Sequence, residues 1–155
     1  MKTILIMRHG EAQALQAQDH LRELTQRGRQ QADHVGQWLA QRFNPQGLLV
    51  SPYVRAQQTA ECVKEHCRGF TLEQTCDDII PSANAKTAVD YLQALTEVHT
   101  EIDTWLVVAH MPIVSYMVAE FCPEQMPIFA TCGVAHIDYD PGTMRARWQA
   151  LYSPN

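Results

Sequence analysis

Residues 3–10 read TILIMRHG, a short apolar run that ends in a polar turn. The five residues from Thr3 to Met7 carry no charge and include β-branched side chains, a pattern typical of a strand buried on both faces. Arg8 and His9 follow directly. Ligands of open α/β sheets bind beyond the carboxyl ends of the strands, so this arginine and this histidine are candidate site residues.

Apolar runs and helical stripes alternate through most of the remaining chain. In the first half we expect a helix from Thr25 to about Phe43, a strand at Leu48–Val50, and a helix that runs to about His66. Ser51 and Pro52 are the expected N-cap and first residue of that second helix. In the second half we expect a short strand near Phe70–Glu73, a helix marked by Ala88, Leu92 and Leu95, a strand at Trp105–Ala109, a helix opened by His110-Met111-Pro112, and two strands near Gly133–Tyr139 and Met144–Leu151. This alternation predicts an α/β fold, a three-layer sandwich with a mostly parallel sheet and helices on both faces. No repeat or linker interrupts it, so residues 1–155 are expected to form one domain.

Composition excludes several classes of protein. The chain has 155 residues, of which 46% are hydrophobic and 19% charged, and its formal net charge is −5, which is ordinary for a soluble globular protein. It has no basic block, which disfavours nucleic acid as a partner. No apolar stretch approaches the ~20 residues of a membrane helix, and the run at 4–7 is too short for a signal peptide. We therefore expect a cytoplasmic protein that does not bind membranes.

The cysteines give no sign of a disulfide framework or a metal site. They are odd in number and none forms a C-x-x-C pair, so free and mostly buried thiols are the expected state. The five are Cys62, Cys67, Cys76, Cys122 and Cys132. We expect neither a metal nor another cofactor.

Two further strand ends carry chemistry. Arg55 comes just beyond the second strand, and His110 follows the strand at Trp105–Ala109. Taken singly, each has an ordinary explanation: a histidine after a strand is often a turn or core residue, and an arginine in the first turn of a helix is often a solvated surface group. Together, however, two guanidinium groups and two imidazoles lie at the same edge of the sheet. The forked donors of guanidinium match phosphate oxygens, so this combination indicates a phosphoryl-transfer pocket.

Four blocks of sequence resemble those of one family, the histidine phosphatase superfamily, also called phosphoglycerate-mutase-like. The blocks are RHGE at 8–11, SPYVRAQQTA at 51–60, HMP at 110–112, and the segment of Arg22, Leu24-Thr25 and Gly28 that opens the first helix. Length and blocks look most like the short SixA-type phosphohistidine phosphatases, and the resemblance spans nearly the whole chain. It implies the phosphoglycerate-mutase-like fold.

The resemblance also implies roles for the matching residues. His9 would attack phosphorus and become phosphohistidine, while Arg8 and Arg55 neutralise the phosphoryl oxygens and His110 donates to them. Arg22 would reach either the phosphate or the surface of a partner. The helix that opens after His110 would add its N-terminal dipole.

Several positions depart from the family pattern or stay open. Met111 stands where an asparagine often follows the third-block histidine. No glutamate general-acid motif occurs between Phe70 and Lys86; Glu73, Asp77 and Asp78 are the carboxylates nearby, with surface charge as their plainer explanation. Glu11 either orients the loop or a histidine, or is a solvated turn residue. Gly28 is expected to permit close packing.

The missing acid indicates the substrate. An alkoxide leaving group needs a proton donor, whereas the imidazole of phosphohistidine leaves readily. Roughly forty residues, 67–104, separate the helix of Arg55 from the strand before His110, which leaves little room for a lid. We therefore expect a monomeric phosphatase whose open pocket binds phosphate or another oxyanion and acts on a histidine-phosphorylated protein, such as a phosphotransfer domain or phosphocarrier. A small-molecule phosphomonoesterase or mutase, and a catalytically silent phosphate-binding module, are the alternatives.

Overall fold

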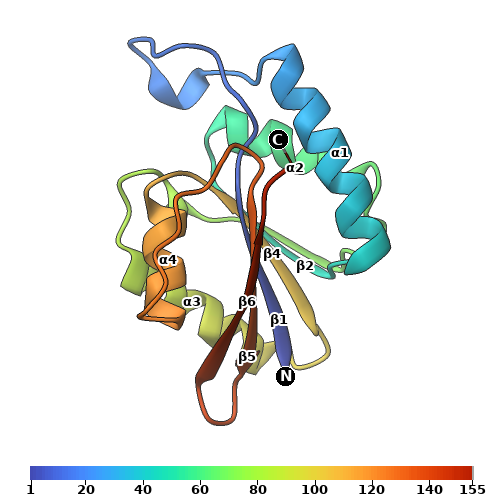
Figure 1. Cartoon of the computed structure of the whole chain (residues 1–155), viewed down its shortest axis with the longest axis vertical. Helices are drawn as coiled ribbons and strands as arrows, with labels where there is room; N and C mark the ends of the chain where they lie inside the picture. Colours follow the sequence, from blue (N-terminus) through green and yellow to red (C-terminus); the bar gives the residue numbers. More distant parts are fainter. Residues whose placement is uncertain (155) are drawn as a thin grey trace.

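The computed structural model describes residues 1–154, and within them six strands form one sheet in the order β3-β2-β4-β1-β5-β6 (Figure 1). The strands are β1 (Lys2–Arg8), β2 (Gly47–Val50), β3 (Leu72–Thr75), β4 (Thr104–Ala109), β5 (Val134–Asp140) and β6 (Arg145–Tyr152). The helices are α1 (Gln26–Arg42), α2 (Val54–Lys64), α3 (Ala85–Val98) and α4 (Ile113–Phe121), with 3-10 turns η1 (Asp19–Leu21) and η2 (Asp77–Ile79). Strands β3, β2, β4 and β1 are mutually parallel, and β5 runs antiparallel to β1 and to β6.

Helices cover both faces of the sheet, which confirms the predicted three-layer α/β fold. Successive side chains of a strand point to opposite faces. Ile4 and Ile6 of β1 therefore pack with α3 and α4, whereas Leu5 and Met7 pack with α1 and α2. All four are fully buried, and each contributes roughly 1.5–3 kcal/mol by leaving water.

The register of the parallel strands brings three carboxyl ends to one edge. Arg8 of β1 lies opposite Ala109 of β4, and Val50 of β2 lies opposite Val108. The pairing continues past the strands, because the His9 N–H donates to the Ala109 carbonyl at 3.0 Å and the Ser51 N–H to the Val108 carbonyl at 3.1 Å. The residues that follow β1, β2 and β4 thus meet above the sheet.

The starts of α2, β3 and α4 lie two or three residues later than the sequence predicts. Ser51 is still bonded to β4, so Tyr53 is the N-cap and α2 begins at Val54 instead of Pro52. Strand β3 begins at Leu72, because Phe70 packs against the cluster under α1 and α2 instead of joining the sheet. Helix α4 begins at Ile113, after Pro112.

Candidate active site

His9 is buried and fixed in one tautomer. Its Nδ1 lies 2.6 Å from the Gly10 carbonyl oxygen, which can only accept, so Nδ1 carries the proton. Its Nε2 accepts from Nε of Arg55 at 3.3 Å and therefore holds the lone pair. Burial lowers the pKa of His9 to about 4, and the nearby Arg55, Arg8 and Arg22 add to the shift against the opposing effect of the Gly10 carbonyl. His9 is thus a neutral imidazole near pH 7.

His110 lies beside His9, with ring centroids 5.2 Å apart. Its Nε2 is 2.7 Å from the Ser51 hydroxyl oxygen, which also accepts the Tyr53 N–H at 3.2 Å. Within the described residues Nε2 is the only acceptor in reach of the Ser51 proton, so the hydroxyl donates to Nε2 and the His110 proton is on Nδ1. Within residues 1–154 that Nδ1 is buried without a hydrogen-bond partner. Burial, followed by the neighbouring His9 and arginines, lowers the pKa of His110 to about 2.

Two arginines complete the cluster. Arg55, 3% exposed, reaches from the first turn of α2 to His9. Arg8 donates from Nη1 to the Phe129 carbonyl at 2.8 Å, while its buried Nε has no partner in the part of the chain that the structure describes. Burial lowers the pKa of both guanidinium groups, as do the neighbouring arginines, yet arginine remains charged at working pH. Arg8 Nε and His110 Nδ1 are thus buried donors available to an anion.

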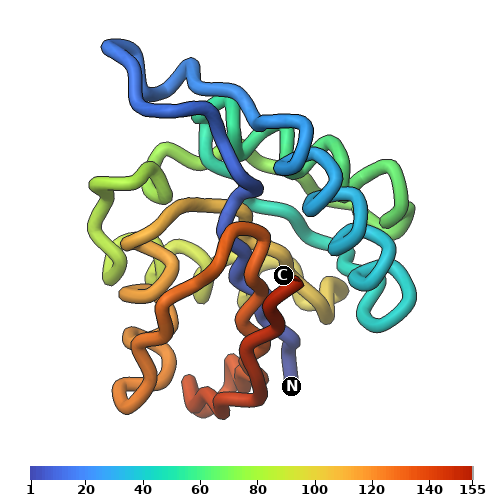
Figure 2. The backbone as a smooth tube through the Cα atoms, turned by 45° about the horizontal axis from the view of Figure 1, so that its top comes forward, coloured from blue at the N-terminus to red at the C-terminus, as the bar shows by residue number. Residues whose placement is uncertain are grey.

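Arg22 belongs to the segment between β1 and α1, which projects beyond the carboxyl end of β1 (Figure 2). Its Nε donates to Asp19 at 2.8 Å and its Nη1 to the Gln13 carbonyl at 2.7 Å. The carboxylate of Asp19, which accepts from Arg22, also accepts from Arg55 Nη2 at 3.2 Å, so Arg22 lies beside Arg55 at the edge of the cluster. All five predicted site residues therefore gather at one edge of the sheet.

Close backbone contacts hold the loop after His9 in place. The Thr59 hydroxyl accepts the Gly10 N–H at 3.0 Å and donates to the Arg55 carbonyl at 2.8 Å, which ties the loop to α2. A Cβ atom at Gly28 would lie 2.0 Å from the Glu11 carbonyl oxygen, so only glycine fits there. The expectation that Gly28 permits close packing is confirmed.

Comparison with known proteins agrees with this arrangement. A family model described as the histidine phosphatase superfamily (branch 1) matches residues 4–78. Phosphohistidine phosphatase SixA of Escherichia coli is 35% identical over 149 residues, which cover 94% of this chain and 91% of that protein. The chain belongs to the histidine phosphatase superfamily. A SixA homolog of Haemophilus influenzae is 36% identical over 149 residues and 88% of each chain.

A solved structure supports the same assignment. The protein histidine phosphatase SixA complexed with tungstate matches with a TM-score of 0.90 and 33% identity, covering 98% of this chain and 97% of that one. The phosphoglycerate-mutase-like fold is confirmed, and the chain is a phosphatase, a hydrolase of phosphoryl groups, as its SixA relatives and its superfamily together support. Among the helices of residues 1–154, none is long and apolar enough to cross a membrane.

None of the carboxylates left open by the sequence forms a hydrogen bond or ion pair with the cluster within residues 1–154. Glu11 pairs with the exposed Arg27 at 3.5 Å, and Glu73 with Lys64 at 3.1 Å. Asp77 and Asp78 lie in η2, and neither bonds to the histidines or arginines of the site described in residues 1–154. Sequence reasoning missed Ser51 and Asp19, the latter a carboxylate that contacts Arg55.

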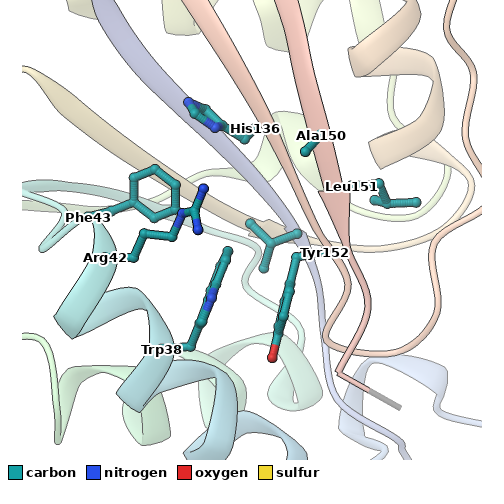
Figure 3. A pocket seen from close by; sticks show the side chains of 8 residues that line it. Trp38, Arg42, Phe43, His136, Ala150, Leu151 and Tyr152 are labelled. Atoms are coloured by element: carbon teal, nitrogen blue, oxygen red, sulfur yellow. The ribbon is translucent and has the colours of Figure 1, made fainter.

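A separate cavity of about 280 Å³ lies between the end of α1 and the β5–β6 hairpin (Figure 3). Trp38 and Tyr152 stack on each other there at 4.0 Å, and Arg42 and His136 complete the polar lining. None of its lining residues belongs to the cluster that the superfamily motifs mark. The cluster around His9, which holds the motif residues, is the candidate active site, and this cavity lies elsewhere in the fold.

Proposed function

We propose that this phosphatase removes the phosphoryl group of phosphohistidine on another protein through a covalent phosphohistidine at His9. The observation that carries the proposal is the neutral, buried ring of His9, whose Nε2 lone pair faces Arg55. An imidazole without a proton on the attacking nitrogen needs no base to activate it. The relatives named phosphohistidine phosphatase support the choice of substrate.

In the first step, Nε2 of His9 forms a bond to phosphorus while the bond from phosphorus to the substrate nitrogen breaks. The electron pair of that bond stays on the leaving imidazole. Arg8 Nε, Arg55 and His110 Nδ1–H donate to the phosphoryl oxygens, where charge spreads in the transition state. In the second step water attacks phosphorus, and the electron pair of the His9–phosphorus bond returns to Nε2 as phosphate is released.

The same charged groups explain the proposed preference for a P–N bond. The described cluster holds donors for the transferred group but no protonated carboxyl group that could supply an alkoxide with a proton. A leaving imidazole that is already protonated on its other nitrogen departs as a neutral molecule and needs no such donor. The pocket is therefore suited to phosphohistidine more than to a phosphate monoester.

We also propose the setting in which the enzyme acts. Roughly forty residues between α2 and β4 form β3, η2 and α3. An open mouth suits a phosphohistidine displayed on a folded partner, such as a phosphotransfer domain or phosphocarrier. Five unpaired cysteines suit a reducing cytoplasm, and the single sheet suits one monomeric domain.

The test compares two substrates at one pH. Purified enzyme should show kcat/KM on a phosphohistidine protein at least ~100-fold above that on an alkyl phosphate ester, equivalent to about 2.7 kcal/mol of differential transition-state binding. Equal or better cleavage of a sugar phosphate would contradict the proposal and favour a small-molecule phosphomonoesterase.

A further inference from the structure

A single carboxylate is held at the mouth of the site by two arginines. Arg22 Nε donates to Oδ1 of Asp19 at 2.8 Å, and Arg55 Nη2 donates to Oδ2 at 3.2 Å. The Asp19 carbonyl accepts a third bond, from Arg55 Nη1 at 2.9 Å. The Asp19 side chain is still 40% exposed, so it borders both the buried cluster and solvent.

Arg55 connects this carboxylate to the nucleophile. The guanidinium group that binds Asp19 through Nη2 also donates from Nε to His9 Nε2. A transferring phosphoryl group must lie against His9 Nε2, and in-line transfer places the leaving group on the far side of phosphorus, toward solvent. In the described chain, the ion pairs of Arg55 and Arg22 go to Asp19 alone. Asp19 therefore borders the path of the leaving group.

The carboxylate is an acceptor and not a proton donor. Partial burial raises the pKa of Asp19, but the charges and hydrogen bonds of Arg55 and Arg22 together bring it below its ordinary value. An ionised carboxylate cannot protonate an alkoxide. It can accept a hydrogen bond from a cationic N–H, and such charge-assisted bonds are roughly twice as strong as neutral ones.

Phosphohistidine offers such an N–H, because its ring has a second nitrogen that binds a proton near neutral pH. We infer that Asp19 forms a leaving-group subsite, in which its carboxylate accepts the N–H of the non-phosphorylated ring nitrogen. This inference rests on the proposed function. As His9 attacks, the P–N electron pair returns to the ring, and the ring leaves as neutral imidazole with that N–H intact.

The alternative is that Asp19 only holds Arg55 and Arg22 in position. The two roles differ in how they depend on the substrate. A carboxylate that positions arginines affects every phosphoryl transfer equally, since all substrates present the same phosphoryl group. A carboxylate that binds the leaving ring affects only substrates with an N–H at that place.

The experiment measures the ratio of kcat/KM on a phosphohistidine peptide to kcat/KM on p-nitrophenyl phosphate, whose leaving group has no N–H. The variant is Asp19→Asn, which keeps the size of the side chain and removes its charge. The control is Glu23→Gln, in the same segment, whose carboxylate contacts Gln58 and Arg29 instead of the cluster. Both substrates are assayed on one preparation, so any loss of folded protein cancels in the ratio.

We expect the ratio of the two kcat/KM values to be at least ~10-fold lower in Asp19→Asn and unchanged in Glu23→Gln. A decrease of this size is expected when a charged hydrogen bond to only one of the two substrates is lost. An Asp19→Asn ratio within about twofold of wild type overturns the leaving-group subsite, because both substrates then depend on Asp19 equally. Equal or better cleavage of an alkyl or sugar phosphate by the wild-type enzyme overturns the proposed function as well. Failure of the leaving-group subsite is thus seen in the Asp19→Asn variant, whereas failure of the proposed function is seen in the wild-type enzyme.

Discussion

The active-site cluster and the cavity beside the β5–β6 hairpin contain the same kinds of side chain. Arg55 lies 5.1 Å from the ring centre of Tyr53, and Arg42 lies 5.5 Å from that of Phe43. The histidines differ in their partners. His136 of the cavity lies 3.1 Å from the carboxylate of Asp138 and is a fifth exposed, whereas His9 is buried against an arginine.

This difference shows that the type of a residue alone does not make it catalytic; the charges and hydrogen-bond partners around it decide. In the described cluster no carboxylate bonds to His9 or His110, and positive charges surround both rings. The uncharged form of imidazole is thereby favoured, and a bound phosphoryl group supplies the missing negative charge. His136 of the cavity instead has the carboxylate of Asp138 beside its ring.

The largest expected effect comes from removing the nucleophile. His9→Ala should lower kcat/KM on phosphohistidine by at least ~10⁴-fold, because the covalent step is lost. His136→Ala should retain activity within about threefold, as expected of a histidine outside the site. Labelled substrate should leave an acid-labile, base-stable phosphoenzyme in wild type and in His136→Ala but not in His9→Ala. Wild-type turnover by His9→Ala would exclude the mechanism.

Arginine substitutions give the next largest difference. Arg55→Lys keeps the charge but loses the planar fork that reaches several oxygens, so kcat should fall ~10²–10³-fold. Arg42→Lys, in the cavity, should stay near wild type. The comparison needs kcat and KM from steady-state kinetics on one substrate. Equal effects at the two arginines would show that the fork of Arg55 has no special role.

Ser51 tests the tautomer of His110. Ser51→Ala removes the hydroxyl that donates to Nε2, so Nδ1 no longer always holds the proton, and kcat should fall ~10-fold. Nitrogen chemical shifts of the His110 ring should report an Nδ1–H tautomer in wild type and a mixture in the variant. A single unchanged tautomer in Ser51→Ala would refute this role.

The dependence of stability on pH is a smaller effect. The pKa of His9 is about 4 in the folded protein and near 6.5 in the unfolded chain. Between these values the unfolded state binds more protons, so the free energy of unfolding falls as pH falls from 6.5 toward 4. The urea midpoint should be lower at pH 5 than at pH 7.5, and this difference should shrink in His9→Gln. An identical difference in the variant would contradict the shifted pKa.

Removal of metal should have no effect. Arg8, Arg55 and His110 supply the charge that a metal ion would otherwise give to the transferring group. Activity should survive dialysis against a chelator, and tungstate or vanadate should inhibit by resembling that group. A strict requirement for an added divalent cation would contradict this expectation.

The sequence predicted the layers and the clustered residues because both depend on local patterns. The run from Thr3 to Met7 is apolar throughout, and the strand before His110 is equally apolar, so both are buried central strands. Their parallel register is enough to bring Arg8, His9 and His110 together. These features follow from burial and strand direction alone.

What the sequence did not predict depends on contacts between distant segments. Asp19 lies in a segment without periodicity, and its partner Arg55 is thirty-six residues away. Ser51 fits an N-cap by sequence, yet it remains bonded to β4 and holds His110. The later start of β3 has a similar cause, because Phe70 packs against the cluster under α1 and α2 instead of joining the sheet.

The position of β4 between β1 and β2 has a consequence for how the protein folds. Residues 2–8 and 47–50 are synthesised long before residues 104–109, yet β1 and β2 do not pair with each other. Until β4 inserts between them, each has an unpaired apolar edge, and such late, non-local pairing makes folding slow and aggregation-prone. Because His9 follows β1 and His110 follows β4, the two histidines come together only when β4 pairs with β1, so activity should return during refolding only in the phase that buries Trp105 of β4.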